Sequence, residues 1–323
     1  MLNKRKKYKL VILARSFAKS SRKPIEYLEN NGFDVEIKRN HDINNEKKIA
    51  ELIGEADAAI VGSDKIGSIV YNFCKNLRVV SKHGVGLDNI DLKGAKERNI
   101  TVTITPGANH ESVAELTWLL ILSASRDLIN VSDYVRRMDW KYPYLGNEVY
   151  NKTIGIIGYG RIGRAVVRRA VGYHCKILVY DPILEKIEPV SGIDIKKVTL
   201  KQLLQSSDII SVHAPLSDKS EKMIGEDAFR EIKDGCILIN TSRGELIDED
   251  ALYKALTNGK IKAAALDVFS NEPPIGNKLL KLKNVIATPH IGTHTEESNY
   301  RMGMLAAQNV VKVICDKNDL EVI

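Results

Sequence analysis

The chain alternates short apolar runs with amphipathic segments over nearly its whole length. Five runs near the start have the length of buried strands: Lys9–Ala14, Asp34–Lys38, Ala58–Val61, Arg78–Lys82 and Thr101–Ile104. Helical spacing predicts helices between them, for example over Lys23–Asn31, which ends at an Asn-Gly breaker, and over Glu46–Ile53. This alternation predicts a parallel sheet with helices on both faces.

A second alternating series begins near Thr153. Residues 111–137 before it predict one or two long helices with Ala, Leu and Ile on one side. The apolar runs of the second series are Thr153–Gly158, Lys176–Tyr180, Ile209–His213, Cys236–Thr241, Ala263–Val268 and Val285–Ala287. Such a series is typical of a dinucleotide-binding sheet. A last helix, from Thr295 to about Ile314, has no sheet of its own and is expected to pack on the first domain.

The two series predict an α/β fold with two doubly wound parallel-sheet domains. The second domain, over residues 101–290, would be inserted between residues 1–100 and the returning helix in residues 291–323. A length of 323 residues agrees with two domains.

The net charge of +7 changes this picture little, because much of it lies in a tail at the start: Lys4, Arg5, Lys6, Lys7 and Lys9. The rest of the chain carries about +2, so a solvated tail is favoured over a nucleic-acid site. No apolar run approaches the ~20 residues of a membrane helix. Four widely spaced cysteines, expected to be buried reduced thiols, favour a cytoplasmic location: Cys74, Cys175, Cys236 and Cys315.

The segment Gly158–Gly163 has the pattern G-x-G-x-x-G, which is weak evidence by itself. Here it directly follows the predicted strand Thr153–Ile157 and opens a predicted helix, which is the context that a dinucleotide-binding turn requires. Gly158 would permit the tight turn, Gly160 would let the backbone approach a pyrophosphate, and Gly163 would let helix and strand pack closely. The helix N-terminus offers N–H groups and a positive dipole end to phosphates.

Asp181 ends the next predicted strand, about twenty residues after the glycine turn. A carboxylate there accepts from both hydroxyls of an adenosine ribose and repels a 2′-phosphate. Pro182 adds no positive charge that would attract one. The sequence therefore favours NAD over NADP.

Three later segments carry groups suited to acid–base chemistry: Asn240–Gly244, Leu266–Pro273 and Ala287–Gly292. Each follows a predicted strand and so lies at the carboxyl end of the sheet, where ligands bind in open α/β folds. Arg243 offers a planar fork for a carboxylate or a carbonyl oxygen. His290 can exchange a proton near neutral pH, and Glu272 beside it would favour the protonated ring and fix its orientation. These groups suit hydride transfer to or from an α-keto acid.

With these motifs, the chain resembles the D-isomer-specific 2-hydroxyacid dehydrogenase family from end to end. The resemblance also covers three further segments: Lys82–Asp91, Gly107–Glu115 and His213–Ser220. Ser217 and Ser220 stand where the family commonly has Thr, a change that keeps the hydroxyl. The resemblance implies a Rossmann NAD-binding domain inserted into a flavodoxin-like substrate-binding domain.

The resemblance also implies roles for individual residues. Arg243 would bind and polarise the substrate, His290 would be the acid–base, and Glu272 would tune it. The amides of Val85 and Gly86 would hold the substrate carboxylate.

For the cofactor, the resemblance implies contacts from several loops. The amides of Arg161 and Ile162 would meet the pyrophosphate, and Asp267 would meet the nicotinamide carboxamide. The other residues expected beside NAD are Gly158, Gly160, Gly163, Asp181, His213, Ala214, Pro215, Thr241, Ser242 and Gly292.

Two cationic positions bear on the substrate. The segment Arg15–Lys19 resembles phosphoglycerate dehydrogenases, and Arg15 could face a distal anion, although an exposed loop with incidental charge explains it equally well. Lys82 stands where phosphoglycerate-type members often carry Arg. We expect reversible hydride transfer between NAD(H) and a D-2-hydroxyacid. The first candidate is 3-phosphoglycerate, and hydroxypyruvate/glycerate or another anionic 2-hydroxyacid is the alternative.

Other classes of function fit less well. His290 and His294 are four apart, but Pro289 and Gly292 disfavour a helix there and no thiol is near, so no metal is expected. A non-catalytic NAD(H)-sensing regulator could retain the same Arg, Glu and His, but the chain lacks long terminal extensions for partners. The expected partners are a small anionic substrate and a second copy of the chain, bound through residues 111–140, with no nucleic acid and no membrane.

Overall fold

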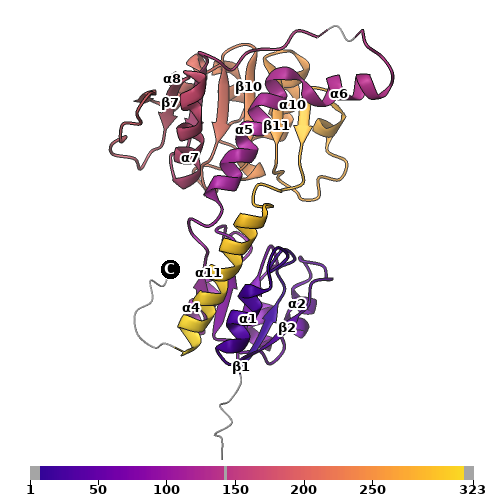
Figure 1. The fold of residues 1–323 in the computed structure, drawn as a ribbon, viewed down its shortest axis with the longest axis vertical. Coiled ribbons are helices and arrows are strands. Elements are labelled where there is room, and N and C mark those ends of the chain that lie inside the picture. Colours follow the sequence, from indigo (N-terminus) through magenta and orange to yellow (C-terminus); the bar gives the residue numbers. More distant parts are fainter. Residues whose placement is uncertain (1–7, 142–143, 316–323) are drawn as a thin grey trace, which may run out of the picture. The chain divides into compact units, whose positions relative to one another are not determined.

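A computed structural model of the chain describes residues 8–141 and 144–315. The predicted basic tail at residues 4–7 lies outside the described residues. The chain forms two compact units (Figure 1), the first made of Met1–Asn109 with Thr293–Ile323 and the second of His110–Gly292. The second unit is therefore inserted into the first.

The first unit contains a five-stranded parallel sheet in the order β2-β1-β3-β4-β5. Its strands are β1 (Tyr8–Ile12), β2 (Phe33–Ile37), β3 (Ala58–Val61), β4 (Val79–Lys82) and β5 (Thr101–Thr103). The central strand β3 is apolar throughout and buried on both faces, as expected for a parallel sheet covered by helices. The strand order is that of flavodoxin-like sheets, whose ligands bind at the carboxyl ends of the strands.

The helices of the first unit are α1 (Lys23–Asn30), α2 (Glu46–Ile53), α3 (Ser68–Phe73), α4 (Leu92–Glu97) and α11 (Glu296–Cys315). Although α11 is distant in sequence, it packs on α1 and β4. Its buried residues Ala306, Ala307 and Val310 share one apolar core with Leu10 and Ile12 of β1. Helix α11 therefore belongs to the same domain as strands β1–β5, although the second unit separates them in the sequence.

The second unit contains a seven-stranded parallel sheet in the order β12-β11-β10-β9-β6-β7-β8. Its strands are β6 (Thr153–Ile157), β7 (Lys176–Tyr180), β8 (Asp194–Lys197), β9 (Ile209–Val212), β10 (Cys236–Asn240), β11 (Ile261–Leu266) and β12 (Val285–Ala287). Two doubly wound parallel sheets confirm the predicted fold class. Strand β8 was not predicted, because this edge strand is mostly exposed and polar and has no apolar run.

Helices cover both faces of the second sheet. The helices of this unit are α5 (His110–Arg126), α6 (Leu128–Arg136), α7 (Arg161–Arg169), α8 (Leu200–Ser206), α9 (Glu226–Glu231) and α10 (Glu249–Thr257), with short 3₁₀ turns η1 (Ala170–Tyr173), η2 (Gly244–Leu246) and η3 (Lys278–Lys281). The predicted long helical segment is thus two helices, and α5 packs on α7, β10 and β11. Trp118 of α5 fixes this contact, since its indole N–H donates to the carbonyl of Val166 at 2.9 Å.

Three cysteines, Cys74, Cys175 and Cys236, are buried free thiols, as expected. Burial raises the pKa of Cys236 to about 12, so this thiol stays protonated and unreactive at neutral pH. The prediction of burial was wrong for Cys315, which is exposed at the end of α11. No helix in the described part of the chain is long and apolar enough to cross a membrane.

Candidate active site

The predicted functional segments of the second unit lie at one edge of its sheet, where the parallel strands end. Gly158 follows β6 and His213 follows β9. These two strands are neighbours at the point where the strand order reverses, which is where open α/β sheets bind ligands. The amide of His213 donates to the carbonyl of Ile157 at 2.7 Å, so the loops after β6 and β9 start side by side.

The backbone of the glycine turn packs so closely at Gly158 and Gly163 that a side chain at either position would clash. A Cβ on Gly158, whose φ is +90°, would lie 2.7 Å from the backbone of His213 and Ala214, and a Cβ on Gly163 would lie 2.3 Å from the carbonyl oxygen of Gly158. A Cβ on Gly160 would meet nothing within 4 Å, so the backbone there faces open space. In the described chain no side chain caps α7, which begins at Arg161. Open amides at a helix start beside an exposed glycine fit the pyrophosphate of a dinucleotide.

Asp181 follows β7 and supports the same turn. Its Oδ2 accepts from the amide of Tyr159 at 2.8 Å, and its Oδ1 accepts from the amide of Ile183 at 3.1 Å. The carboxylate therefore lies against the glycine turn, at the end of the strand where the ribose acid of a Rossmann fold is expected.

His213 is half-buried beside the glycine turn. Its Nε2 lies 2.8 Å from the hydroxyl of Ser211, whereas its buried Nδ1 has no partner within the described residues. Burial lowers the pKa of His213 to about 3, so the ring is neutral at physiological pH. A buried polar atom without a partner is the kind of group that a bound cofactor could satisfy. Ala214 and Pro215 continue this loop, and the carbonyl of Pro215 accepts from the hydroxyl of Ser220 at 2.8 Å.

His290 and Glu272 form a pair at the ends of β12 and β11. The Nδ1 of His290 lies 2.8 Å from Oε2 of Glu272, and both side chains are partly exposed. Partial burial opposes ionisation of Glu272. The hydrogen bond and charge of His290, the amide of Phe269 and the charge of Arg243 outweigh it and keep the pKa of Glu272 below its usual value. The pair therefore combines a permanent carboxylate with an imidazole that can exchange protons.

The backbone that carries His290 is held by Asp267, which is itself buried. Oδ1 of Asp267 accepts from the hydroxyl of Thr288 at 2.6 Å and from the amide of Ile291 at 2.9 Å, while Oδ2 accepts from the amide of Gly292 at 2.9 Å. His290 has a φ of +53°, an unusual conformation for a residue with a side chain. Three bonds to one carboxylate can maintain this conformation, which points to a bracing role for Asp267 in addition to the cofactor contact implied by resemblance.

Arg243 lies in the turn after β10, which is organised by Asn240. The Asn240 side chain accepts from the amide and hydroxyl of Ser242, both at 3.0 Å, and donates to the carbonyl of Arg243 at 2.7 Å. The hydroxyl of Thr241 is buried 3.0 Å from that of Thr117 in α5. The side chains of Thr241 and Ser242 thus stabilise the turn, and the guanidinium of Arg243 is near enough to Glu272 to act on its pKa.

In the first unit, Lys82 ends β4 with its ammonium turned inward. The Nζ atom donates to the carbonyl of Gly62 and to Oδ1 of Asn89, both at 2.6 Å, and only 8% of the residue is exposed. A side-chain hydrogen bond between Lys82 and Asn89 thus joins the two ends of the loop that contains Val85 and Gly86.

Arg15 lies in the loop after β1 and differs from Lys82 in being exposed. One Nη of Arg15 donates to the carbonyl of His41 at 2.8 Å. Val85 is 37% exposed, so its loop is accessible on the surface of this unit. The structure thus places Arg15, Val85 and Gly86 in loops at the carboxyl ends of β1 and β4.

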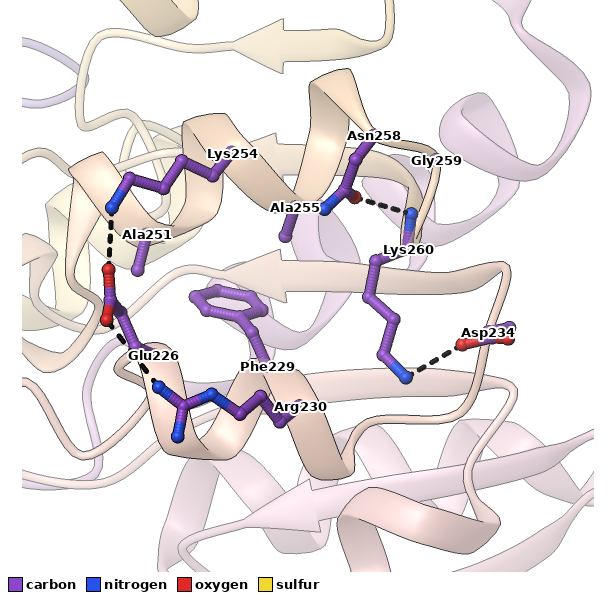
Figure 2. A pocket seen from close by; sticks show the side chains of 10 residues that line it. All are labelled: Glu226, Phe229, Arg230, Asp234, Ala251, Lys254, Ala255, Asn258, Gly259 and Lys260. Carbon is purple, nitrogen blue, oxygen red and sulfur yellow. Dashed lines mark hydrogen bonds and ion pairs between the residues drawn. The ribbon is translucent and has the colours of Figure 1, made fainter.

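A hollow of about 670 Å³ lies elsewhere in the second unit, between α9 and α10. It is near the amino ends of β10 and β11, opposite the edge with His290. Figure 2 shows that its charged groups pair with one another, Glu226 with Lys254 at 2.6 Å and Asp234 with Lys260 at 2.7 Å. This self-neutralised rim has no acid–base pair like that of His290, and we exclude it as the catalytic site.

Comparison with known proteins agrees with this geometry. The family model described as "D-isomer specific 2-hydroxyacid dehydrogenase, NAD binding domain" matches residues 118–292, more than half of the chain. The chain belongs to the D-isomer-specific 2-hydroxyacid dehydrogenase family. Proteins of this family are oxidoreductases, and the matched domain identifies NAD as the cofactor.

Individual relatives of this dehydrogenase family carry different substrate names. A glyoxylate reductase of Korarchaeum cryptofilum is 40% identical over 287 residues, which are 86% of each chain. A D-3-phosphoglycerate dehydrogenase of Archaeoglobus fulgidus is 39% identical over 296 residues, 91% of this chain but 55% of that longer protein. The crystal structure of the TT0316 protein from Thermus thermophilus has a TM-score of 0.86 at 31% identity and covers 95% of this chain and 96% of that one.

Two residues that organise the dehydrogenase loops were not predicted from the sequence, Asn240 and Asn89. Asn240 is the last residue of β10 and lies inside a segment already singled out, so its position at the end of a strand was a usable signal. Asn89 lies seven residues from Lys82, and only the tertiary structure shows that the two side chains meet.

Proposed function

We propose that the chain interconverts a short D-2-hydroxyacid and its 2-keto acid, with His290 as the proton donor and acceptor. The observation that carries this proposal is the 2.8 Å contact between His290 Nδ1 and Glu272. An ionised carboxylate only accepts hydrogen bonds, so Nδ1 carries a hydrogen and Nε2 is the atom that exchanges a proton. NAD(H), when bound, supplies or accepts the hydride.

Arg243 is proposed to bind the carboxylate or the carbonyl oxygen of the substrate. One Nη of Arg243 donates to the carbonyl of Ser242 at 2.7 Å, which restricts the orientation of the guanidinium. A planar cation beside an acid–base pair can hold an anionic substrate and polarise its carbonyl group. In the first unit, the amides of Val85 and Gly86 are the proposed carboxylate ligands.

Among substrates, we propose short 2-keto acids without a second anionic group, such as glyoxylate or hydroxypyruvate. The support is Lys82, whose ammonium is bound to Gly62 and Asn89 inside the first unit. The second candidate is 3-phosphoglycerate, and the exposed guanidinium of Arg15 is the observation that favours it.

We also propose a homodimer formed through α5 and α6. Helix α6 has no buried residue, and Leu128, Ile129 and Val135 are each about half exposed. Leu119 of α5 is 56% exposed. Large apolar side chains exposed along two consecutive helices favour a protein interface there. Light scattering should give twice the chain mass, and Ile129→Asp should shift it toward the monomer. The buried free thiols support a proposed location in the reducing cytoplasm.

The function is tested by measuring NADH oxidation with glyoxylate, hydroxypyruvate, phosphohydroxypyruvate, pyruvate and a branched keto acid. The highest kcat/KM with glyoxylate or hydroxypyruvate, unchanged in Arg15→Gln, supports a short 2-keto acid without a second anionic group as the substrate. The highest kcat/KM with phosphohydroxypyruvate, lost in Arg15→Gln, supports 3-phosphoglycerate as the substrate. Tight NADH binding without turnover of any acid would contradict the proposed catalytic function and indicate a sensor.

A further inference from the structure

The loop that carries Glu272 is bound at both ends by one side chain, Glu249 of α10. The amide of Ser270 donates to Oε1 of Glu249 at 2.8 Å, and Nδ2 of Asn277 donates to Oε2 at 2.6 Å. Ser270 lies two residues before Glu272, and Asn277 lies five residues after it. Both oxygens of a single carboxylate therefore hold the two ends of the segment that positions the partner of His290.

The charged carboxylate of Glu249 accepts hydrogen bonds from two neutral donors, the amide of Ser270 and the side chain of Asn277. Glu249 is the first residue of α10, where the helix dipole stabilises a negative charge. The nearby Lys278 forms its ion pair with Asp250 at 2.6 Å, and within the described residues no cation pairs with Glu249. Hydrogen bonds to an ionised acceptor are about twice as strong as those between neutral groups. Glu249 is thus a strong fixed point for an otherwise exposed loop.

The same loop is also fitted closely to the turn that carries Arg243. A Cβ on Gly244 would lie 2.0 Å from the carbonyl carbon of Phe269 and 2.2 Å from the amide nitrogen of Ser270. The two backbones therefore touch directly, and a shift of Ser270 would change the distance between Arg243 and Glu272. Because Glu249 holds the amide of Ser270, this hydrogen bond affects the positions of both Arg243 and Glu272.

We propose that Glu249 is a positioning residue of the dehydrogenase, which acts by holding the 269–277 loop so that Glu272 meets His290. This inference rests on the proposed role of His290 as the acid–base. Glu249 itself touches neither of the proposed reacting groups, and its effect passes through Glu272.

The test uses Glu249→Gln, a substitution of equal size. A glutamine can accept from one donor, but its amide group would face the other donor, so one end of the loop is released. In keto-acid reduction we expect kcat/KM to fall about tenfold, as for the loss of one charge-assisted hydrogen bond. The alkaline limb of its pH profile should move to lower pH, because a displaced Glu272 no longer favours the protonated imidazole.

Asp250→Asn is the matched control. It removes the neighbouring carboxylate and an exposed ion pair from the same helix start, but no bond to the 269–277 loop. This variant should keep the wild-type pH profile. The same shift in Asp250→Asn, or a loss of stability in Glu249→Gln with an unmoved pH profile, would overturn the proposal.

Two further experiments separate positioning from folding. Asn277→Asp keeps the side-chain oxygen that accepts from the Leu279 amide, but replaces the donor to Glu249 with a repelling carboxylate. It should reproduce the pH shift of Glu249→Gln. In a Glu272→Gln background, Glu249→Gln should change kcat/KM by less than about twofold, since coupled residues are not additive. A full additive loss would contradict action through Glu272.

A readout without turnover distinguishes failure of this inference from failure of the proposed function. The ring protons of His290 can be followed by NMR against pH and identified by their absence in His290→Gln. The midpoint of this titration should be lower in Glu249→Gln than in the wild-type protein, whether or not a substrate is known. An equal midpoint in both proteins would overturn the positioning role even if the dehydrogenase activity is established.

Discussion

The imidazole Nδ1 of His290 and the carboxylate Oε2 of Glu272 lie 2.8 Å apart, although their loops follow different strands. Partial burial disfavours the charge of Glu272, but its contacts with His290, Phe269 and Arg243 keep its pKa below the usual value. Glu272 is therefore ionised at neutral pH. Since keto-acid reduction needs a protonated imidazole, the carboxylate supports the form of His290 that the reaction consumes.

Replacement of Glu272 by Gln should change both the rate and its dependence on pH. We expect kcat/KM for keto-acid reduction to fall by about ten- to a hundredfold, and its alkaline limb to move to lower pH. The sign follows because a neutral amide does not stabilise the positive ring, which then loses its proton at lower pH. Steady-state kinetics across pH measure both effects. Glu231→Gln, which alters an exposed ion pair with Lys201 and a hydrogen bond from Gln205, is the control. An unmoved limb in Glu272→Gln would refute the pairing.

His290→Ala should remove turnover but leave cofactor binding intact. General acid–base groups contribute about 10²–10⁴ in rate, so a loss of at least a hundredfold is expected. NADH affinity, measured by fluorescence titration, should change less than about threefold, because the glycine turn that fits the cofactor lies after a different strand. Retained turnover would show that another group transfers the proton.

Most of the fold could be predicted from local pattern, because a buried parallel strand must be apolar over its length. Ala58–Val61 is such a run and is buried at every position. The pattern fails for Asp194–Lys197, which pairs on one side only and lies at the exposed edge. It also fails for Cys315, since apolar neighbours in sequence do not bury a residue that lies at the end of its helix.

The candidate site was predictable where chemistry lies directly after a strand, as for Gly158, Asp181 and Arg243. Parallel strands bring such residues to one edge whatever the distance between them in the sequence. The orientation of Lys82 was not predictable, because its partners Gly62 and Asn89 come from other loops. A sequence shows that a lysine is present at the end of a strand, but only packing decides whether its charge is used inside the protein.

Asp181→Ala should relax the preference for NAD over NADP. The substitution removes the negative charge that would repel a 2′-phosphate, and it also removes the acceptor of the Tyr159 amide in the glycine turn. We therefore expect KM for NADH to rise about tenfold while KM for NADPH falls or stays constant. The ratio of kcat/KM for the two cofactors is the measurement. Strong discrimination in the variant would argue against a ribose contact by Asp181, and Asp194→Ala at the nearby edge strand serves as the control.

The half-buried His213 should make the stability of the protein depend on pH. Its pKa is lowered by burial to about 3, whereas an unfolded histidine titrates near 6.5, so the unfolded chain binds the proton first as pH falls. The unfolding free energy should thus decrease below about pH 6.5, and His83, whose pKa burial lowers to about 4, acts with the same sign.

His213→Gln should weaken this acid sensitivity while keeping a side chain that can bond to Ser211. The His213 contribution amounts to about 2 kcal/mol between about pH 7 and pH 5, because the unfolded state gains roughly 1.4 kcal/mol per pH unit only below its pKa near 6.5. Urea unfolding of the cofactor-free protein at both pH values should therefore show a smaller difference in the variant, by about that amount. His174→Asn, at an exposed histidine, should leave the difference unchanged. Equal acid sensitivity in His213→Gln and the wild type would mean that folding does not lower the pKa of His213, and would contradict this account.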